Sequence, residues 1–95
     1  MMFYKLFYSE VSRDQIRSLN PKIKPIVKKR VQELKDDPFT GKYLEKELSG
    51  YRSLVAKRFR IIYKIIQNKN IVQIHYVGHR KDIYEILKEV ILKTE

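Results

Sequence analysis

The sequence predicts an α+β fold whose elements follow the order β-α-α-β-β-β-α. Three observations support this fold: an aromatic-rich stretch at residues 2–8, a helical apolar period over residues 22–36, and three alternating segments between residues 51 and 77. Strands joined by short turns pair antiparallel. We therefore expect a small antiparallel sheet, mixed at the N-terminal strand, with a helical hairpin on one face and a C-terminal helix. A chain of 95 residues builds one core, so residues 1–95 are predicted to form a single domain.

The N-terminal half is predicted to form one strand and two helices. Residues 2–8 (MFYKLFY) are rich in aromatic side chains, which favour strands. Ser9 or Ser12 can cap a first helix that ends near residue 20. A second helix, roughly residues 22–36, carries its lysines largely on one side and its apolar residues on the other, namely Ile23, Ile26, Val27, Val31 and Leu34. The two helices are expected to pack as a hairpin.

The C-terminal half is predicted to form a three-stranded meander and a last helix. Residues 38–50 are expected to form a loop that Leu44 and Leu48 anchor to the core. The strands cover roughly residues 51–56, 59–67 and 71–77, joined by turns at Lys57-Arg58 and Asn68-Lys69-Asn70. After Asp82, apolar residues recur with helical spacing, which predicts an amphipathic helix over roughly residues 81–93.

Positive charge is concentrated in the second half of the chain. The formal net charge is +10, and residues 51–81 hold eight basic residues and no acidic one. Such a balance favours a polyanionic partner, either nucleic acid or the ribosome, over the weaker alternative of an anionic membrane. The absence of cysteine excludes disulfides and thiolate metal sites. No stretch looks like a signal peptide or a membrane span, so we expect a cytoplasmic protein.

The alternation of side chains along the strands predicts where these cations lie. Phe59, Ile61, Tyr63 and Ile65 form one set in the middle strand, which leaves Arg60 and Lys64 in the other set. We expect Arg52 to join Arg60 and Lys64 on one open sheet surface, opposite the helices. In the last strand, the apolar set is Val72, Ile74 and Tyr76, with Gln73 and His75 outside. A positive surface of this kind binds a phosphodiester backbone.

Three segments of the predicted sheet resemble the RelE/ParE superfamily of type II toxins, and favour its RelE branch. They are LSGYRSL at residues 48–54, RFRIIYKI at residues 58–65 and VGHRKDIY at residues 77–84. The similarity covers the element order of nearly the whole chain, although the helical hairpin is generic. Three such segments in the same order are more specific than any one of them.

The resemblance implies a ribosome-dependent endoribonuclease that cuts mRNA without a metal or cofactor and is inhibited by a cognate antitoxin. The reaction would be attack of a ribose 2′-OH on the adjacent phosphate, which requires a base, an acid and cations. By similarity, Arg52, Arg60 and Arg80 match the basic residues of the family, and Tyr84 matches a tyrosine that can transfer a proton or stack on a base. Four further cations of the basic segment are expected to bind RNA: Lys57, Arg58, Lys64 and Lys81.

The general base is left open by the sequence. Some RelE toxins carry a second lysine two residues after the first basic residue, whereas this chain has Leu54 there. His79 is one substitute, because an imidazole accepts a proton more readily than a guanidinium at neutral pH. Lys57 is another. Two other functions also stay open: a ParE-like inhibitor of DNA gyrase, and a toxin that has lost activity and acts as a binding or autorepression module.

Overall fold

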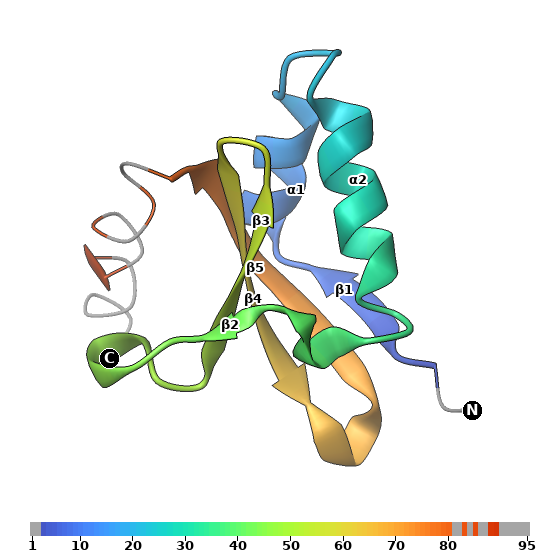
Figure 1. Ribbon diagram of the computed structural model, residues 1–95, viewed down its shortest axis with the longest axis vertical. Coiled ribbons are helices and arrows are strands. Elements are labelled where there is room, and N and C mark those ends of the chain that lie inside the picture. The colour runs from blue at the N-terminus through green and yellow to red at the C-terminus, as the bar shows by residue number, and fades with distance from the viewer. Residues whose placement is uncertain (1–2, 81–82, 84, 86–87, 90–95) are drawn as a thin grey trace.

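The computed structural model describes residues 3–80, 83, 85, 88 and 89. A five-stranded mixed sheet forms one layer, and two helices cover one of its faces (Figure 1). The strand order is β1-β5-β4-β3-β2, in which β1 runs parallel to β5 and all other neighbours are antiparallel. The predicted fold class is therefore confirmed. The elements are β1 (Lys5–Tyr8), α1 (Glu10–Arg17), α2 (Lys24–Glu33), β2 (Lys42–Tyr43), β3 (Tyr51–Ala56), β4 (Phe59–Ile66) and β5 (Ile71–His79).

Two serines attach the start of α1 to the sheet. Ser9 is the N-cap, and its hydroxyl oxygen accepts a hydrogen bond from the Ser12 backbone N–H at 3.0 Å. The Ser9 hydroxyl also donates to the His75 carbonyl oxygen, and the buried Ser12 hydroxyl donates to that of Ile74, both at 2.9 Å. Of the two candidate caps, Ser9 is thus the one used. Ser12 instead holds α1 against β5.

The main core lies between the helices and the sheet. α2 begins at Lys24, with Pro25 in its first turn, and ends at Glu33, a few residues inside the predicted bounds. Arg30 connects α2 to β3, because its Nε donates to the Val55 carbonyl oxygen at 2.9 Å while its guanidinium pairs with Glu33. The buried residues of this core are Ile16, Val27, Val31, Leu34, Leu54, Ala56, Ile61, Tyr63, Val72, Ile74 and Val77.

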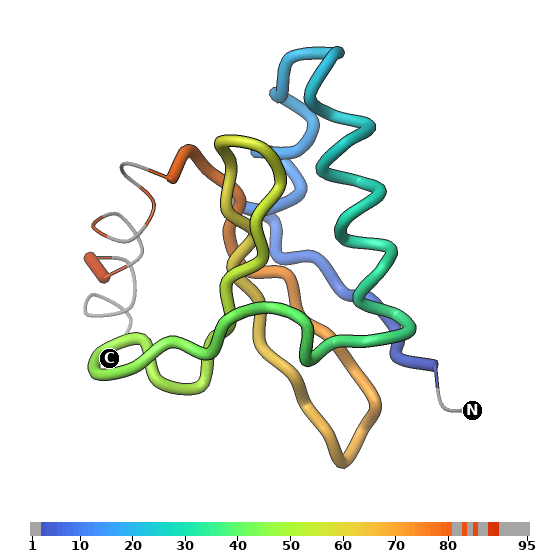
Figure 2. Tube along the Cα trace, viewed as in Figure 1, coloured from blue at the N-terminus to red at the C-terminus, as the bar shows by residue number. Residues whose placement is uncertain are grey.

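A second, smaller core covers part of the opposite face. Leu44, Leu48, Ile62 and Ile83 are buried together there. The trace in Figure 2 shows how the chain after α2 crosses to the side where the described residues after β5 lie. At Gly78, a Cβ would lie 2.7 Å from the Ile83 Cδ1, so this contact depends on glycine. The expectation of one open surface opposite the helices is therefore wrong, because Ile62 is covered.

The segment after α2 is more ordered than predicted. Residues 38–50 were expected to form a loop, but Lys42–Tyr43 pairs with β3 as the edge strand β2. Single 3₁₀ turns precede and follow it, at Pro38–Thr40 and Lys46–Leu48. Leu44 and Leu48 are buried as expected, although in the second core.

The last strand is longer than predicted and contains a β-bulge. Ile62 pairs with Tyr76, whereas Tyr63 pairs with Ile74, so His75 is an extra residue on β5. The predicted apolar row of Val72, Ile74 and Tyr76 is consequently wrong at its end. Val77 continues the row into the main core, and Tyr76 packs against the second core.

The predicted C-terminal helix lies largely outside the described residues. Residues 83, 85, 88 and 89 are helical, which agrees with the prediction over 81–93 as far as the structure describes it. Among all the residues that the structure describes, no helix is long and apolar enough to cross a membrane.

Candidate nucleic-acid interface

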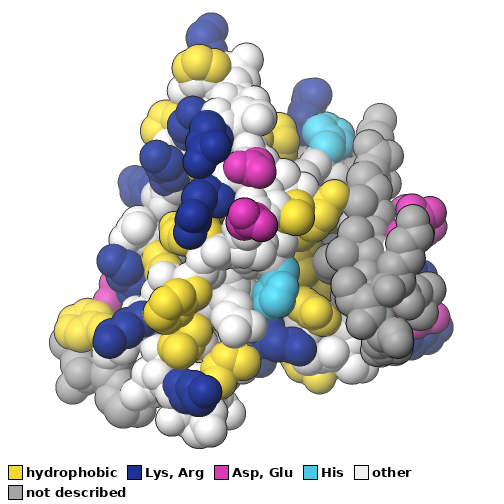
Figure 3. Space-filling model, turned by 180° about the vertical axis from the view of Figure 1, so that it is seen from behind, with side chains coloured by type: hydrophobic (Ala, Val, Ile, Leu, Met, Phe, Trp, Pro, Cys, Tyr) yellow, Lys and Arg dark blue, Asp and Glu magenta, His cyan; other side chains and the backbone are white. Residues whose placement is uncertain are grey.

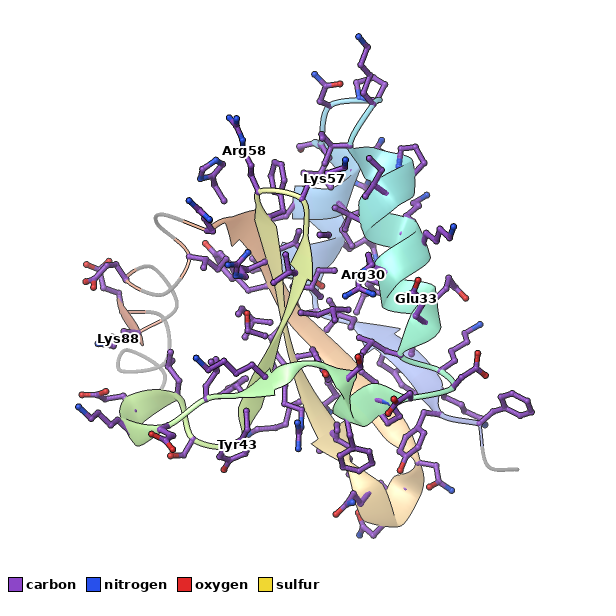
Figure 4. The ribbon with its side chains drawn as sticks, viewed as in Figure 1. Arg30, Glu33, Tyr43, Lys57, Arg58 and Lys88 are labelled. Atoms are coloured by element: carbon purple, nitrogen blue, oxygen red, sulfur yellow. The ribbon has the colours of Figure 1, made fainter. Side chains whose placement is uncertain are left out.

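Basic side chains gather at the end of the sheet where the β3–β4 turn meets the end of β5. Lys57 and Arg58 form the turn and are exposed, and Figure 4 shows them at its tip. The Arg80 backbone N–H donates to the Arg58 carbonyl oxygen at 2.9 Å. This bond holds the two segments together, so that the backbones of Arg58 and the exposed Arg80 are adjacent. We call Lys57, Arg58, Arg60, His79 and Arg80 the basic end of the sheet.

Arg60 and His79 complete the basic end from opposite faces. Arg60 pairs with Gly78, on the face opposite the helices, and is half-exposed. His79 pairs with Phe59, which packs against the main core, and the two rings meet edge to face at 5.9 Å. His79 was expected beyond the last strand, but it is the final residue of β5 because it pairs with Phe59.

Arg52 does not share the surface of Arg60 and Lys64, contrary to prediction. In the β3–β4 pair, Arg52 lies opposite Tyr63, whereas Lys64 lies opposite Tyr51 and Arg60 opposite Val55. Directly paired residues point to the same face, so Arg52 is on the helix side. The reason is the two-residue turn, which pairs every even-numbered residue of one strand with an odd-numbered residue of the other.

The Arg52 guanidinium is bound to the segment between α2 and β3. Its Nη1 donates to the Gly41 carbonyl oxygen at 2.9 Å and to that of Phe39 at 3.4 Å. The guanidinium carbon lies 5.2 Å from the centre of the Phe39 ring and 5.6 Å from that of Tyr43. Next to it, the Tyr63 hydroxyl donates to the Pro38 carbonyl oxygen at 2.6 Å and accepts from the Gly41 N–H at 2.9 Å. Burial raises the pKa of Tyr63.

Lys64 belongs to a separate polar cluster further along the sheet. It lies on the same face as Arg60, but the buried Ile62 and the second core stand between them. The Lys64 ammonium lies 4.6 Å from the centre of the Tyr51 ring, which contacts the His75 ring edge to face at 5.3 Å. Burial, and secondly the charge of Lys64, lower the pKa of His75. The sequence did not reveal this cluster, because the bulge that places His75 here has no clear sequence signal.

Residues 51–80, which form strands β3 to β5 with their turns and the residue after β5, carry seven basic side chains and no carboxylate. Two predicted site residues, Lys81 and Tyr84, lie outside the described residues. Among the residues that the structure does describe, no group of His, Cys, Asp and Glu side chains is arranged to hold a metal ion. The basic end can thus supply positive charge and an imidazole to a phosphodiester.

A groove of about 460 Å³ lies on the helix side of the molecule, apart from the basic end. Figure 3, seen from behind, shows Lys and Arg side chains gathered over the helix pair, with acidic side chains beside them. The groove is lined by Tyr8, Arg13, Ile16, Arg17, Lys24, Lys28 and Gln32. Asp14 neutralises part of this charge, since it pairs with Arg17 at 3.3 Å.

Comparison with known proteins gives a family match and several similar folds. Residues 6–84 match the family described as the ParE toxin of the type II toxin-antitoxin system parDE. The Mycobacterium tuberculosis RelBE2 toxin-antitoxin complex contains a chain with 28% identity and a TM-score of 0.77, covering 83% of this chain and all of that one. No curated protein matches the sequence.

Two more distant structures share the fold. A free RelE toxin variant from Escherichia coli has 21% identity and a TM-score of 0.73 over 94% of this chain and 99% of its own. RelE in the archaeal RelE-RelB complex of Pyrococcus horikoshii has 16% identity and a TM-score of 0.71, over 83% and 97% of the two chains.

Proposed function

Because the chain belongs to the RelE/ParE superfamily of type II toxin-antitoxin toxins, we propose that it is a ribosome-dependent endoribonuclease acting on mRNA in the cytoplasm. The observation that carries this proposal is the basic end of the sheet. There, the backbones of Arg58 in the β3–β4 turn, Arg60 near the start of β4 and Arg80 just after β5 lie close together, in a stretch of 30 residues with no carboxylate. Such a site attracts the phosphates of RNA.

The proposed reaction is an internal transfer at one phosphate of the mRNA. A base removes the proton of the ribose 2′-OH, the 2′ oxygen bonds to phosphorus, and the bond from phosphorus to the 5′ oxygen breaks. An acid then protonates the 5′ oxygen, which leaves a 2′,3′-cyclic phosphate and a 5′-hydroxyl. The transition state carries extra negative charge on phosphorus, so fixed cations lower its energy.

The geometry suggests how the roles are divided. Arg60 and Arg80 would stabilise the charged phosphate, and Lys57 and Arg58 would bind the flanking backbone. His79 is the proposed base. His79 and Arg60 lie on opposite faces of the sheet, so the phosphate would be held beyond the strand ends, where side chains from both faces can reach the same phosphate. Tyr84 is the proposed acid or stacking residue. Arg52 has no role here, because its guanidinium is bound to two carbonyl oxygens on the other side.

A cognate antitoxin is the proposed partner that keeps the toxin inactive. The support is that the relatives include chains solved as toxin-antitoxin complexes. An acidic or amphipathic antitoxin segment would be attracted to the basic end, or would compete for the apolar contact that Ile83 makes on the second core.

The test is primer extension on mRNA in a cell-free translation reaction. We expect cuts within codons, and no cuts in the same mRNA without ribosomes. Arg60→Ala should lower the cleavage rate about 10²- to 10³-fold, with a smaller loss of ribosome binding. His79→Gln should also remove cleavage if the imidazole is the base. Lys69→Ala is the control, because this exposed cation lies in the β4–β5 turn and should leave cleavage unchanged.

A second candidate function is inhibition of DNA gyrase. The family model that the chain matches is that of the ParE toxin, which favours it. A gyrase inhibitor would leave mRNA intact in the translation reaction and would block supercoiling of a plasmid by purified gyrase. That result would reject the endoribonuclease. A protein that does neither, yet still binds an antitoxin, would be an inactive toxin serving as a binding or autorepression module.

A further inference from the structure

Two exposed aromatic rings lie close to the guanidinium of Arg52 at the β2 edge of the sheet. Phe39 is 45% exposed and Tyr43 is 50% exposed. The Arg52 guanidinium lies 5.2 Å from the first ring centre and 5.6 Å from the second. We call these three side chains the Phe39–Arg52–Tyr43 platform. Large exposed aromatic side chains around a cation indicate a binding surface.

The platform is held in place by hydrogen bonds below it. The Arg52 Nη1 donates to the carbonyl oxygens of Gly41 and Phe39. The Asp37 carboxylate accepts from the Phe39 N–H at 3.1 Å, and the Tyr43 hydroxyl accepts from the Gly50 N–H at 3.0 Å. The platform is therefore preorganised, so that its side chains lose little conformational entropy when a ligand binds.

We propose that the Phe39–Arg52–Tyr43 platform binds an unstacked base of single-stranded RNA. Bases of single-stranded RNA stack on aromatic rings and on arginine guanidinium planes. Charge favours the same ligand, because the Arg52 guanidinium lies within 6 Å of both ring centres, at 5.2 and 5.6 Å, and the net charge of the chain is +10. That the ligand is RNA rests on the proposed function. Arg52 then has a role in binding RNA and not the catalytic role that the sequence predicted.

The experiment compares two oligonucleotides that differ only in their bases. Fluorescence anisotropy, without ribosomes, measures the affinity of a labelled hexauridylate and of an abasic ribose-phosphate strand of equal length. The wild type should bind hexauridylate about 5- to 150-fold more tightly, the range found for stacking of one base. Phe39→Ala combined with Tyr43→Ala should bind both strands equally. Phe39→Leu keeps an apolar side chain but loses the flat ring, so it should reduce the preference for hexauridylate. Because this substitution preserves apolar bulk, a reduced preference would not be explained by a folding defect.

A matched control is available on β1 and the residues before it. Phe3 and Phe7 are 61% and 52% exposed, so Phe3→Ala combined with Phe7→Ala removes as much exposed aromatic surface. This variant should keep the full preference for hexauridylate. Circular dichroism melting should show that all variants are folded at the assay temperature.

Three results would overturn the platform: a wild type with no preference, platform variants that keep the preference, or platform variants that weaken only antitoxin binding. The last result would assign the rings to a protein partner. The ribosome assay separates this inference from the proposed function. A protein that prefers hexauridylate but cuts no mRNA would retain the platform and reject the endoribonuclease. A protein that cuts mRNA but shows no preference for hexauridylate would retain the endoribonuclease and reject the platform.

Discussion

Replacing Tyr63 with phenylalanine tests how the segment between α2 and β3 is held. Tyr63 is fully buried, and its hydroxyl bonds to both the Pro38 carbonyl oxygen and the Gly41 N–H. The packing at Gly41 is tight, because a Cβ there would lie 2.4 Å from the Tyr63 hydroxyl oxygen. Tyr63→Phe keeps the ring in the core and removes one atom. Two buried backbone groups, the Pro38 carbonyl and the Gly41 N–H, then lose the hydrogen bond that the hydroxyl provides.

The expected loss of stability follows from those two groups. A buried polar group left without a hydrogen bond costs about 1–3 kcal/mol, so for two such groups the free energy of unfolding should fall by about 2–6 kcal/mol. This loss is a large part of the total free energy of unfolding of a typical domain, which is roughly 5–15 kcal/mol. For a chain of this size, the melting temperature should fall by about 10 °C or more. Urea unfolding at neutral pH measures the loss, with an unchanged dependence on urea concentration.

Tyr43→Phe is the matched control for this substitution. The Tyr43 hydroxyl also accepts from a glycine N–H, that of Gly50, but the bond is exposed. Water can replace the lost partner there, so the free energy of unfolding should change by less than about 1 kcal/mol. A Tyr63→Phe protein no less stable than Tyr43→Phe would show that the buried hydroxyl does not hold this segment, and would refute the reasoning.

Three further predictions concern acid stability, salt and the proposed acid. Burial and the charge of Lys64 lower the pKa of His75. As the pH falls below 6.5, the unfolded chain therefore takes up a proton before the folded chain does, and the free energy of unfolding falls. His75→Gln should lose less stability than the wild type between pH 7 and pH 5, and an equal loss in both proteins would contradict this prediction. Ribosome affinity should fall steeply with salt, with a log-log slope of several units if the basic end contacts RNA phosphates, whereas a flat response would exclude such contacts. Tyr84→Phe should slow cleavage without weakening ribosome binding, and an unchanged rate would leave stacking as its role.

The local patterns of the sequence were enough to predict the fold class. The apolar spacing from Ile23 to Leu34 specifies the buried side of α2, and the turn at Lys57-Arg58 specifies the β3–β4 hairpin. Both depend on residues within about three helical turns or one hairpin of each other, where side-chain direction follows from backbone geometry alone. The concentration of cations after residue 50 is likewise a property of the sequence.

The face of each strand residue required information about its partner strand. Arg52 was expected beside Arg60 because each alternates with apolar neighbours in its own strand. The two-residue turn, however, pairs even with odd positions, and Arg52 faces the helices. Because the length of the turn sets the register, the sequence itself contains the information that places Arg52 on the helix side.

Other features were decided only by tertiary structure. The bulge at His75 reverses the alternation of β5, and the second core joins Leu48, Ile62 and Ile83, which lie 14 and 21 residues apart in sequence. Neither leaves a periodic pattern, because each arises where segments distant in the chain meet and exclude water from a shared surface. The sequence by itself therefore determined the elements and the charge of this protein. Packing between distant segments determined the second core, which separates Lys64 from Arg60, and the bulge, which places His75 beside Tyr51.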